Sequence, residues 1–221
     1  PGRIPIRERG SGKGPVPGWT SAHEWKGWVP FDALPSVIDP PSGIIVTANN
    51  AVIGPDYRYP LADVWAYGYR SKRISDLLEQ AGAAGELDAA AMSEIQLDTR
   101  NGFAETLVPH LLRVGVDDFT ADGQRLLRGW DGEQTAGSAA AAYYNAVWRN
   151  LLAKTFADEL PKDARPSGGD RWYEVVGRLL DDPDNVWWDD VRTKGRREQR
   201  DDILRAAMVS ARLELTKDLN K

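Results

Sequence analysis

Two asparagines and one arginine stand where their side chains could take part in chemistry. Asn49 and Asn50 follow a β-branched, apolar run, residues 44–48, with Pro and Gly residues just before it. Such a run is typical of a short buried strand. The end of a strand is a common place for functional side chains, but Asn-Asn is equally ordinary in a turn. From these residues alone, we favour the turn.

Arg70 comes 21 residues after Asn49, at the start of a helical pattern. With Lys72 and Arg73 it forms a short basic series. Arginine is mostly exposed in folded proteins. Taken alone, the series therefore indicates a solvated helix face.

The elements that must position these residues change in kind near residue 60. Before it, the chain is rich in Gly, Pro and Trp. After it, apolar residues recur at helical spacing, and Asp88 and Ser138 are suitable N-caps. Pro109 is expected to kink or restart one of these helices. We therefore predict a mainly α protein of two parts: a β-edge segment over residues 1–60 that carries the strand ending at Asn49, and a helical region over residues 61–221.

Composition excludes several classes of function. The chain has 221 residues, 42% of them hydrophobic, a formal net charge of −5 and no cysteine. Net negative charge argues against a nucleic-acid partner, and no apolar run approaches the length of a membrane span. Disulfide and zinc-thiolate chemistry need cysteine. The two histidines, His23 and His110, stand apart, so we expect neither in a metal site or a catalytic triad.

Large aromatic residues gather near the N-terminus, in a stretch with little regular pattern. They are Trp19, Trp25, Trp28 and Phe31. Without a partner they would form an exposed apolar patch, which marks an interaction surface. They could equally pack on the helices of this chain. The first residue is Pro1 and no targeting signal is present, so we expect a piece of a longer protein.

Several short motifs occur in one order over roughly the first 80 residues. They are Gly18-Trp19, Trp25-Lys26-Gly27-Trp28-Val29-Pro30-Phe31, Leu34-Pro35, Pro40-Pro41-Ser42-Gly43, Thr47-Ala48-Asn49-Asn50 and Tyr69-Arg70-Ser71-Lys72-Arg73-Ile74. This ordered series resembles the β-chain of the penicillin acylase family, amidohydrolases with an N-terminal nucleophile. The resemblance implies that the β segment belongs to the αββα core of such a hydrolase.

The resemblance also implies roles for single residues. Asn49 matches the asparagine of the family's oxyanion hole, whose side-chain NH2 stabilises the charge that builds on the carbonyl oxygen. A slip of one residue in the match would move that role to Asn50. Arg70 matches the arginine that orients this asparagine and lies close to the amino group of the nucleophile.

Two further features of such an enzyme are the nucleophile, which we expect outside this chain, and a calcium site, to which this chain would contribute a ligand. The family's nucleophile is a Ser at a chain start made by self-cleavage, and its own α-amino group acts as the base. No Ser of this chain can take that place, so we expect the chain alone to be inactive. The chemistry requires no cofactor. Some members bind a structural calcium ion, and Asp63 is the candidate ligand here, with Asp56 as a competitor and a helix cap as the alternative role for Asp63.

The expected function is therefore a share in hydrolysis of a linear amide. β-Lactam side chains, acyl-homoserine lactones and acyl chains of lipopeptides all remain open as substrates. The expected partners are the α-chain and the upstream part of the β-chain, with a small-molecule amide as substrate. By family resemblance we expect a periplasmic or secreted protein. Two alternatives stay open, a non-catalytic helical binding or assembly module and an inactive family member.

Overall fold

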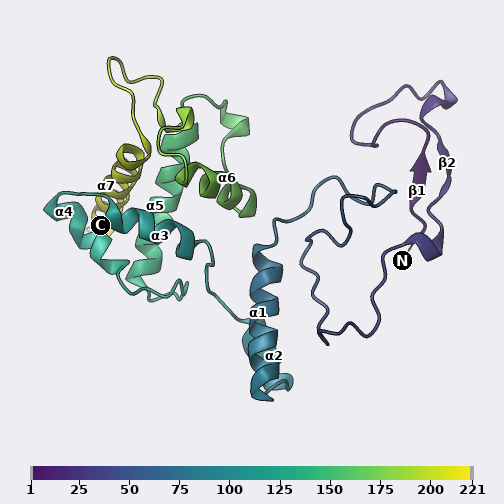
Figure 1. The fold of residues 1–221 in the computed structure, drawn as a ribbon. Helices are drawn as coiled ribbons and strands as arrows, with labels where there is room; N and C mark the ends of the chain where they lie inside the picture. The colour runs from purple at the N-terminus through teal and green to yellow at the C-terminus, as the bar shows by residue number, and fades with distance from the viewer. Residues whose placement is uncertain (1, 220–221) are drawn as a thin grey trace. The chain divides into compact units, whose positions relative to one another are not determined.

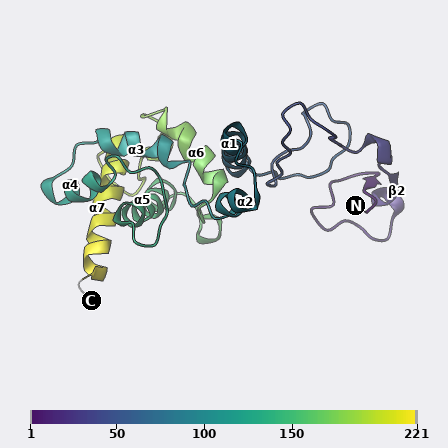
Figure 2. The same ribbon diagram turned by 90° about the horizontal axis from the view of Figure 1, so that it is seen from below.

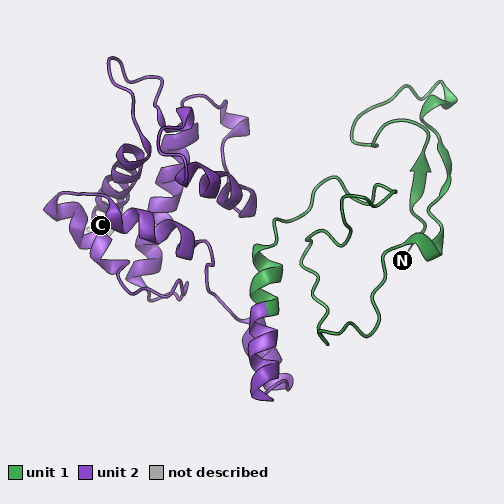
Figure 3. Ribbon diagram, viewed as in Figure 1, with its two compact units in different colours: residues 1–75 green, residues 76–221 purple. Residues whose placement is uncertain are grey.

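The computed structural model describes residues 2–219. Contacts between Cα atoms divide the chain into two compact units, residues 1–75 and 76–221 (Figure 3). The division falls inside the first helix, whereas the sequence predicted a change of structure near residue 60. The first unit carries Asn49, Arg70 and Asp63.

The regular β structure of the first unit is one antiparallel pair of short strands, β1 (Pro5–Arg7) and β2 (Trp25–Trp28) (Figure 1). Pro5 is paired with Trp28, and the register shifts between Ile6 and Arg7. Backbone hydrogen bonds extend the pairing at both ends, from Glu8 N to Glu24 O at 3.0 Å and from Val29 N to Ile4 O at 2.8 Å. Both strands lie within the first 60 residues, as predicted.

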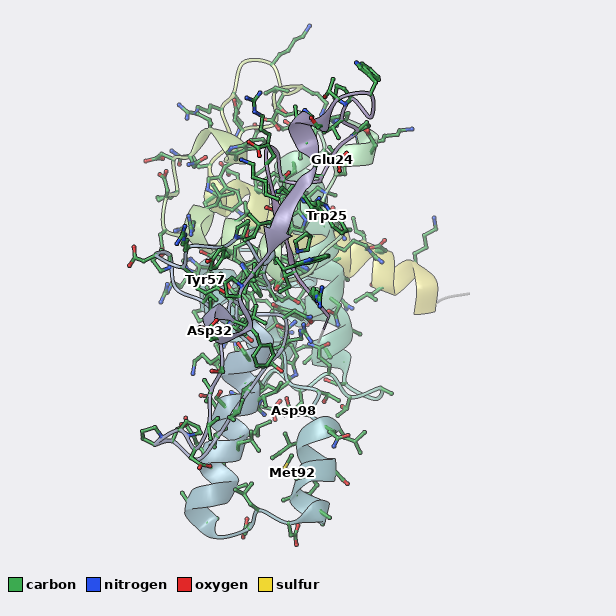
Figure 4. All side chains as sticks on the ribbon, turned by 90° about the vertical axis from the view of Figure 1, so that its right-hand side faces the viewer. Glu24, Trp25, Asp32, Tyr57, Met92 and Asp98 are labelled. Atoms are coloured by element: carbon green, nitrogen blue, oxygen red, sulfur yellow. The ribbon has the colours of Figure 1, made fainter. Side chains whose placement is uncertain are left out.

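The N-terminal aromatic residues lie largely in solvent in this chain. Trp19 is 86% exposed and Phe31 81%, and the two tryptophans of β2 are about half exposed. Trp25 and Trp28 meet edge to face at 5.4 Å between ring centroids, and the guanidinium groups of Arg3 and Arg7 lie over their rings. Figure 4 labels Trp25 on this strand. Trp19 and Phe31 therefore leave most of their apolar surface in water.

The first unit has almost no hydrophobic core of its own. Among the described residues with buried hydrophobic side chains, only Val29 and Ala48 belong to it. Its long loops are held by single polar contacts, such as the 2.8 Å hydrogen bond from Tyr57 Oη to Ala33 O. Figure 4 labels Tyr57 near Asp32, in the same region.

The prediction of a regular buried strand over residues 44–50 is not met in this chain. The segment has no strand assignment, and Ile45 is 61% exposed. A strand needs a hydrogen-bonding neighbour along its length. Here the contact is a single parallel bridge, Asn50 with Ala66, whose bond runs from Ala66 N to Asn49 O at 2.8 Å.

Helices dominate the rest of the described chain, so the protein is mainly α, as predicted (Figures 1 and 2). They are α1 (Tyr69–Ala84), α2 (Ala89–Gln96), α3 (Ala104–Arg113), α4 (Asp118–Leu126), α5 (Ala139–Phe156), α6 (Asp170–Leu180) and α7 (Arg200–Leu219). Short 3-10 turns occur at Ser21–His23, Phe31–Ala33, Lys162–Ala164 and Val186–Trp188. None of the described helices is long and apolar enough to cross a membrane.

Side-chain caps fix where several helices begin. Asp88 accepts a hydrogen bond from Ala91 N at 2.9 Å, and Ser138 accepts one from Ala141 N at 3.1 Å, so both predicted N-caps are confirmed. Asp117 caps α4 in the same way, through Thr120 N at 2.8 Å. Each cap satisfies a backbone N–H that has no partner within the helix. A kink or a restart was predicted at Pro109; α3 continues through this residue, so the helix does not restart there.

The core of the second unit is built around α5. Its buried side chains lie on most sides of the helix, which shows that it is surrounded by neighbours. It packs chiefly on α7, with α4 also against both helices and α3 against α6. Figure 2 shows these helices gathered around α5. Aromatic rings fill the spaces, including the stacked pair Phe103 and Tyr173 at 4.7 Å between centroids.

Candidate functional site

The side chains of Asn49 and Arg70 meet in the first unit. Arg70 Nη2 donates to Asn49 Oδ1 at 2.8 Å and to the carbonyl of Ala48 at 2.8 Å. Asn49 and Arg70 are exposed in this chain, and Ala48 is buried. The two residues that the sequence singled out 21 positions apart are therefore brought into direct contact.

This contact decides which end of the Asn49 amide remains available. The guanidinium group has five donors and no acceptor, so only the oxygen of the amide can face it. The NH2 group, Nδ2, is then directed away from Arg70, and it has no acceptor among the described residues. The site therefore presents a neutral hydrogen-bond donor beside a permanent positive charge.

The backbone of Asn49 has an uncommon conformation. Its φ is 64°, in the left-handed region that asparagine tolerates better than most residues. Its carbonyl accepts the bond from Ala66 N at 2.8 Å. Asn50 follows with its amide already committed to the backbone, since Oδ1 accepts from Ala48 N at 3.0 Å and Nδ2 donates to Ala51 O at 3.3 Å.

Local chain geometry places Arg70 in the first turn of α1. Gly68 has a φ of 90°, which a glycine adopts without strain, and its carbonyl accepts from Lys72 N at 2.8 Å and Ser71 Oγ at 3.0 Å. These bonds fix the start of the helix. The basic series of Arg70, Lys72 and Arg73 thus lies at the start of α1, and Arg70 also contacts Asn49.

Asp63 stands apart from this contact. Its carboxylate pairs with Lys13 Nζ at 3.3 Å. It lies six residues before α1, so it is not the cap of that helix. No group of three or more His, Cys, Asp or Glu side chains among the described residues is arranged to hold a metal ion. Calcium needs six to eight oxygens, so an ion at Asp63 or Asp56 would take most of its ligands from other groups.

Sequence reasoning did not identify the backbone groups of the site. The carbonyl of Ala48 and the N–H of Ala66 each hold the asparagine segment, at 2.8 Å from their partners. Backbone groups carry no side-chain signal, so no pattern of residue types could have found them. The contact of Asn50 was also not predicted. Its Oδ1 accepts from the backbone N–H of Ala48, and that bond depends on how the chain turns locally.

Neither Asn49 nor Arg70 can act as a nucleophile or as a general base at neutral pH, because an amide does not titrate and a guanidinium stays protonated. What the pair can do is stabilise negative charge on an oxygen. Such a charge develops when a carbonyl is attacked. The pair therefore offers a hydrogen-bond donor and a positive charge to such an oxygen.

Comparison with known proteins places the chain in a family. The penicillin amidase family model matches residues 1–221. Penicillin acylase 2 proenzyme of Pseudomonas sp. (strain SE83) is 38% identical over 202 residues, which cover 81% of this chain and 24% of that protein. The acyl-homoserine lactone acylase QuiP of Pseudomonas aeruginosa is 30% identical over 236 residues, covering 95% of this chain and 27% of that protein.

A solved structure agrees in fold. The thermostable penicillin G acylase from Alcaligenes faecalis matches with a TM-score of 0.62 at 21% identity, covering 98% of this chain and 44% of that chain. The chain spans about a quarter of the length of the curated relatives it matches. With the whole chain matched by the family model, the protein belongs to the penicillin amidase family, whose named relatives here are acylases.

Proposed function

We propose that this chain is part of an acylase that hydrolyses a linear amide, in which Asn49 Nδ2 donates to the oxyanion and Arg70 holds Asn49 in place. The observation that carries the proposal is the double contact of one guanidinium nitrogen. Arg70 Nη2 bonds both Asn49 Oδ1 and the carbonyl of the residue before it, each at 2.8 Å. That contact orients the NH2 group outward and keeps it rigid.

A rigid donor is what this chemistry needs. Attack on an amide carbonyl places negative charge on its oxygen, and a preorganised donor stabilises that charge without reorganising during the reaction. The fixed charge of Arg70 beside the site adds to the same effect. Asn49 suits the role better than Asn50, because both polar atoms of the Asn50 amide are bonded to backbone groups.

The remaining parts of the active site would come from the rest of the protein. The nucleophile would be an N-terminal Ser upstream of this segment, with its α-amino group as base. The exposure of Asn49 and the scarcity of core in the first unit support such an arrangement, because both leave surface for the rest of the acylase to cover. Asp63 would serve as a calcium ligand only if that part supplies further oxygens.

The names of the relatives support a proposal for the substrate class. Those that match are named penicillin acylase and acyl-homoserine lactone acylase. Both names describe removal of an acyl group from an amine, so we propose a substrate with an acyl side chain on an amide nitrogen, with lipopeptides as a third class. A periplasmic or secreted location would suit an enzyme with such substrates.

The proposal is tested with the full-length, processed enzyme and its Asn49→Ala variant. A panel of p-nitroanilides with aromatic and aliphatic acyl groups serves as substrate. We expect kcat to fall by roughly 10²–10³ and KM to change little, because the donor acts mainly in the transition state. Asn185→Ala is a matched control, since its side chain caps a 3-10 turn in the helical unit and its kcat should be unchanged.

Two results would contradict the proposal. Near-normal turnover by the Asn49→Ala enzyme would remove the oxyanion role from this residue. A wild-type enzyme that is inactive on the whole panel, from a gene without a Ser at the processing site, would instead favour the inactive family member or the binding module. Reading the upstream part of the gene separates the active enzyme from these two alternatives before any assay, because a processing site followed by Ser supports the enzyme.

A further inference from the structure

We propose that Asn50 is a positioning residue, which acts on the reaction only by holding Asn49. This inference rests on the proposed function of Asn49. It assigns different tasks to the two adjacent asparagines, one as the donor to the oxyanion and the other as the side chain that shapes the backbone around that donor.

The contact that carries the inference is a hydrogen bond across Asn49. Asn50 Oδ1 accepts from the backbone N–H of Ala48 at 3.0 Å. Ala48 is 7% exposed. A buried N–H without a partner is unfavourable, and Asn50 supplies the partner. The bond links the residues on either side of Asn49 and closes the chain into a tight loop around it.

Four hydrogen bonds hold this loop from different directions. Asn50 binds the N–H of Ala48, and Arg70 Nη2 binds the carbonyl of the same residue at 2.8 Å. Ala66 N donates to the carbonyl of Asn49 at 2.8 Å, and Arg70 also binds the Asn49 side chain at 2.8 Å. Both backbone groups of Ala48 are therefore fixed, and Asn49 is held with a φ of 64° between them.

The positive φ makes this holding necessary. Few residues other than glycine adopt that region without cost, and such a conformation persists where surrounding contacts determine it. The direction of the Asn49 side chain depends on its backbone. Loss of the Asn50 bond would let the Asn49 backbone relax, and the Nδ2 donor would move away from the position of the oxyanion.

The test is a double-mutant cycle in the full-length, processed enzyme, with the panel substrate that wild type turns over fastest. We expect Asn50→Ala to lower kcat about tenfold to a hundredfold with KM changed little, since a small misplacement of a catalytic group has effects of this size. In the Asn49→Ala background, Asn50→Ala should have no further effect on kcat, because no donor remains to be misplaced.

Asn101→Ala is the matched control for a general loss of stability. Its Oδ1 also accepts from a backbone N–H two residues away, that of Phe103 at 3.0 Å, but it lies in the helical unit. We expect its kcat to be unchanged. The thermal midpoint of each variant shows how far any loss of folding contributes.

The outcomes distinguish the positioning role of Asn50 from the proposed oxyanion role of Asn49. Normal kcat in Asn50→Ala, with a large loss in Asn49→Ala, overturns the positioning role and leaves the oxyanion role intact. Equal losses from Asn50→Ala in both backgrounds also overturn it, because the effect would then be structural and not pass through Asn49. Normal kcat in Asn49→Ala overturns both.

Discussion

At the scale of single residues, an uncommon backbone conformation falls on Asn49, the proposed donor to the oxyanion. It is one of two non-glycine residues with a positive φ in the described chain, the other being Asp39. Asn49 is the one whose carbonyl and side chain are both held by partners outside its own turn. Backbone strain of this kind tends to cluster at functional sites, so the conformation and the contact with Arg70 both support the proposed role.

A second residue-scale property concerns pH. Burial, together with the nearby cations Arg200 and Arg113, lowers the pKa of His110 below its ordinary value of 6.5, against a smaller opposite effect of Asp181 and Asp201. The folded state therefore disfavours the charged form. As pH falls below 6.5, the unfolded chain takes up the proton first, so the free energy of unfolding should fall until the lowered pKa is passed.

Urea unfolding at pH 7.5 and 5.5, followed by far-UV circular dichroism, measures this effect. His110→Gln, which carries no titratable group at this position, should lose less stability between the two pH values than wild type does. An equal loss in both proteins would mean that other groups cause the acid sensitivity. A smaller loss in wild type would reverse the sign and contradict the lowered pKa.

The sequence predicted those residues of the candidate site whose side chains belong to recognisable motifs. The ordered motifs of the sequence pair Asn49 with Arg70, and the structure places the two side chains in contact at 2.8 Å. Asp63 was chosen by nearness to the helix alone. Its observed partner is Lys13, some fifty residues earlier in the chain, and an ion pair of that kind follows from loop geometry that residue patterns do not encode.

At the scale of elements, the approach of α4 to α5 depends on a glycine. A Cβ added at Gly123 would lie 2.5 Å from Cε2 of Tyr143, a ring that is 1% exposed. We predict that Gly123→Ala destabilises the helical unit by up to about 2 kcal/mol. Overpacking typically costs 1–3 kcal/mol, and the better helix propensity of Ala returns roughly 1 kcal/mol.

Gly177 in α6 is the matched control. A Cβ there would meet Phe103 Cε2 at 3.6 Å, an ordinary contact. Gly177→Ala should therefore be neutral or stabilising, by up to about 1 kcal/mol. Urea unfolding of both variants is the measurement. A stabilised Gly123→Ala protein would show that α4 can move away from Tyr143 at little cost.

Prediction of secondary structure succeeded for helices whose hydrogen bonds, including those of the caps, are made within a few residues of the same segment. The helices α2 and α5 begin at their predicted caps because Asp88 and Ser138 bond to N–H groups three residues later in sequence. The run over residues 44–50 has strand composition, but a strand depends on a neighbour, and this chain offers it only the bridge to Ala66. β1 and β2, with three and four residues, are too short to show a period.

At the scale of the whole chain, the two units differ in how far they can stabilise themselves. The second unit has buried rings and aliphatic side chains on α3, α5, α6 and α7, whereas the first has Val29 and Ala48. Exposed apolar area is unfavourable by roughly 25 cal/mol for each Å² left in water. Trp19 and Phe31, each more than four-fifths exposed, make that cost large for the first unit alone.

We therefore predict how the isolated 221-residue chain behaves. It should have no amidase activity and should either self-associate or hold a loosely ordered N-terminal arm. Amide hydrogen exchange should be slow in α5 and α7, whose buried faces open only with the helical unit as a whole, and fast across residues 2–35. Light scattering alongside the exchange shows whether the chain is a monomer. Strong protection of residues 2–35 in a monomer would mean that their aromatics find a core within the chain. The first unit would then need no larger hydrolase to cover it, and the non-catalytic binding module would become the better account of this protein.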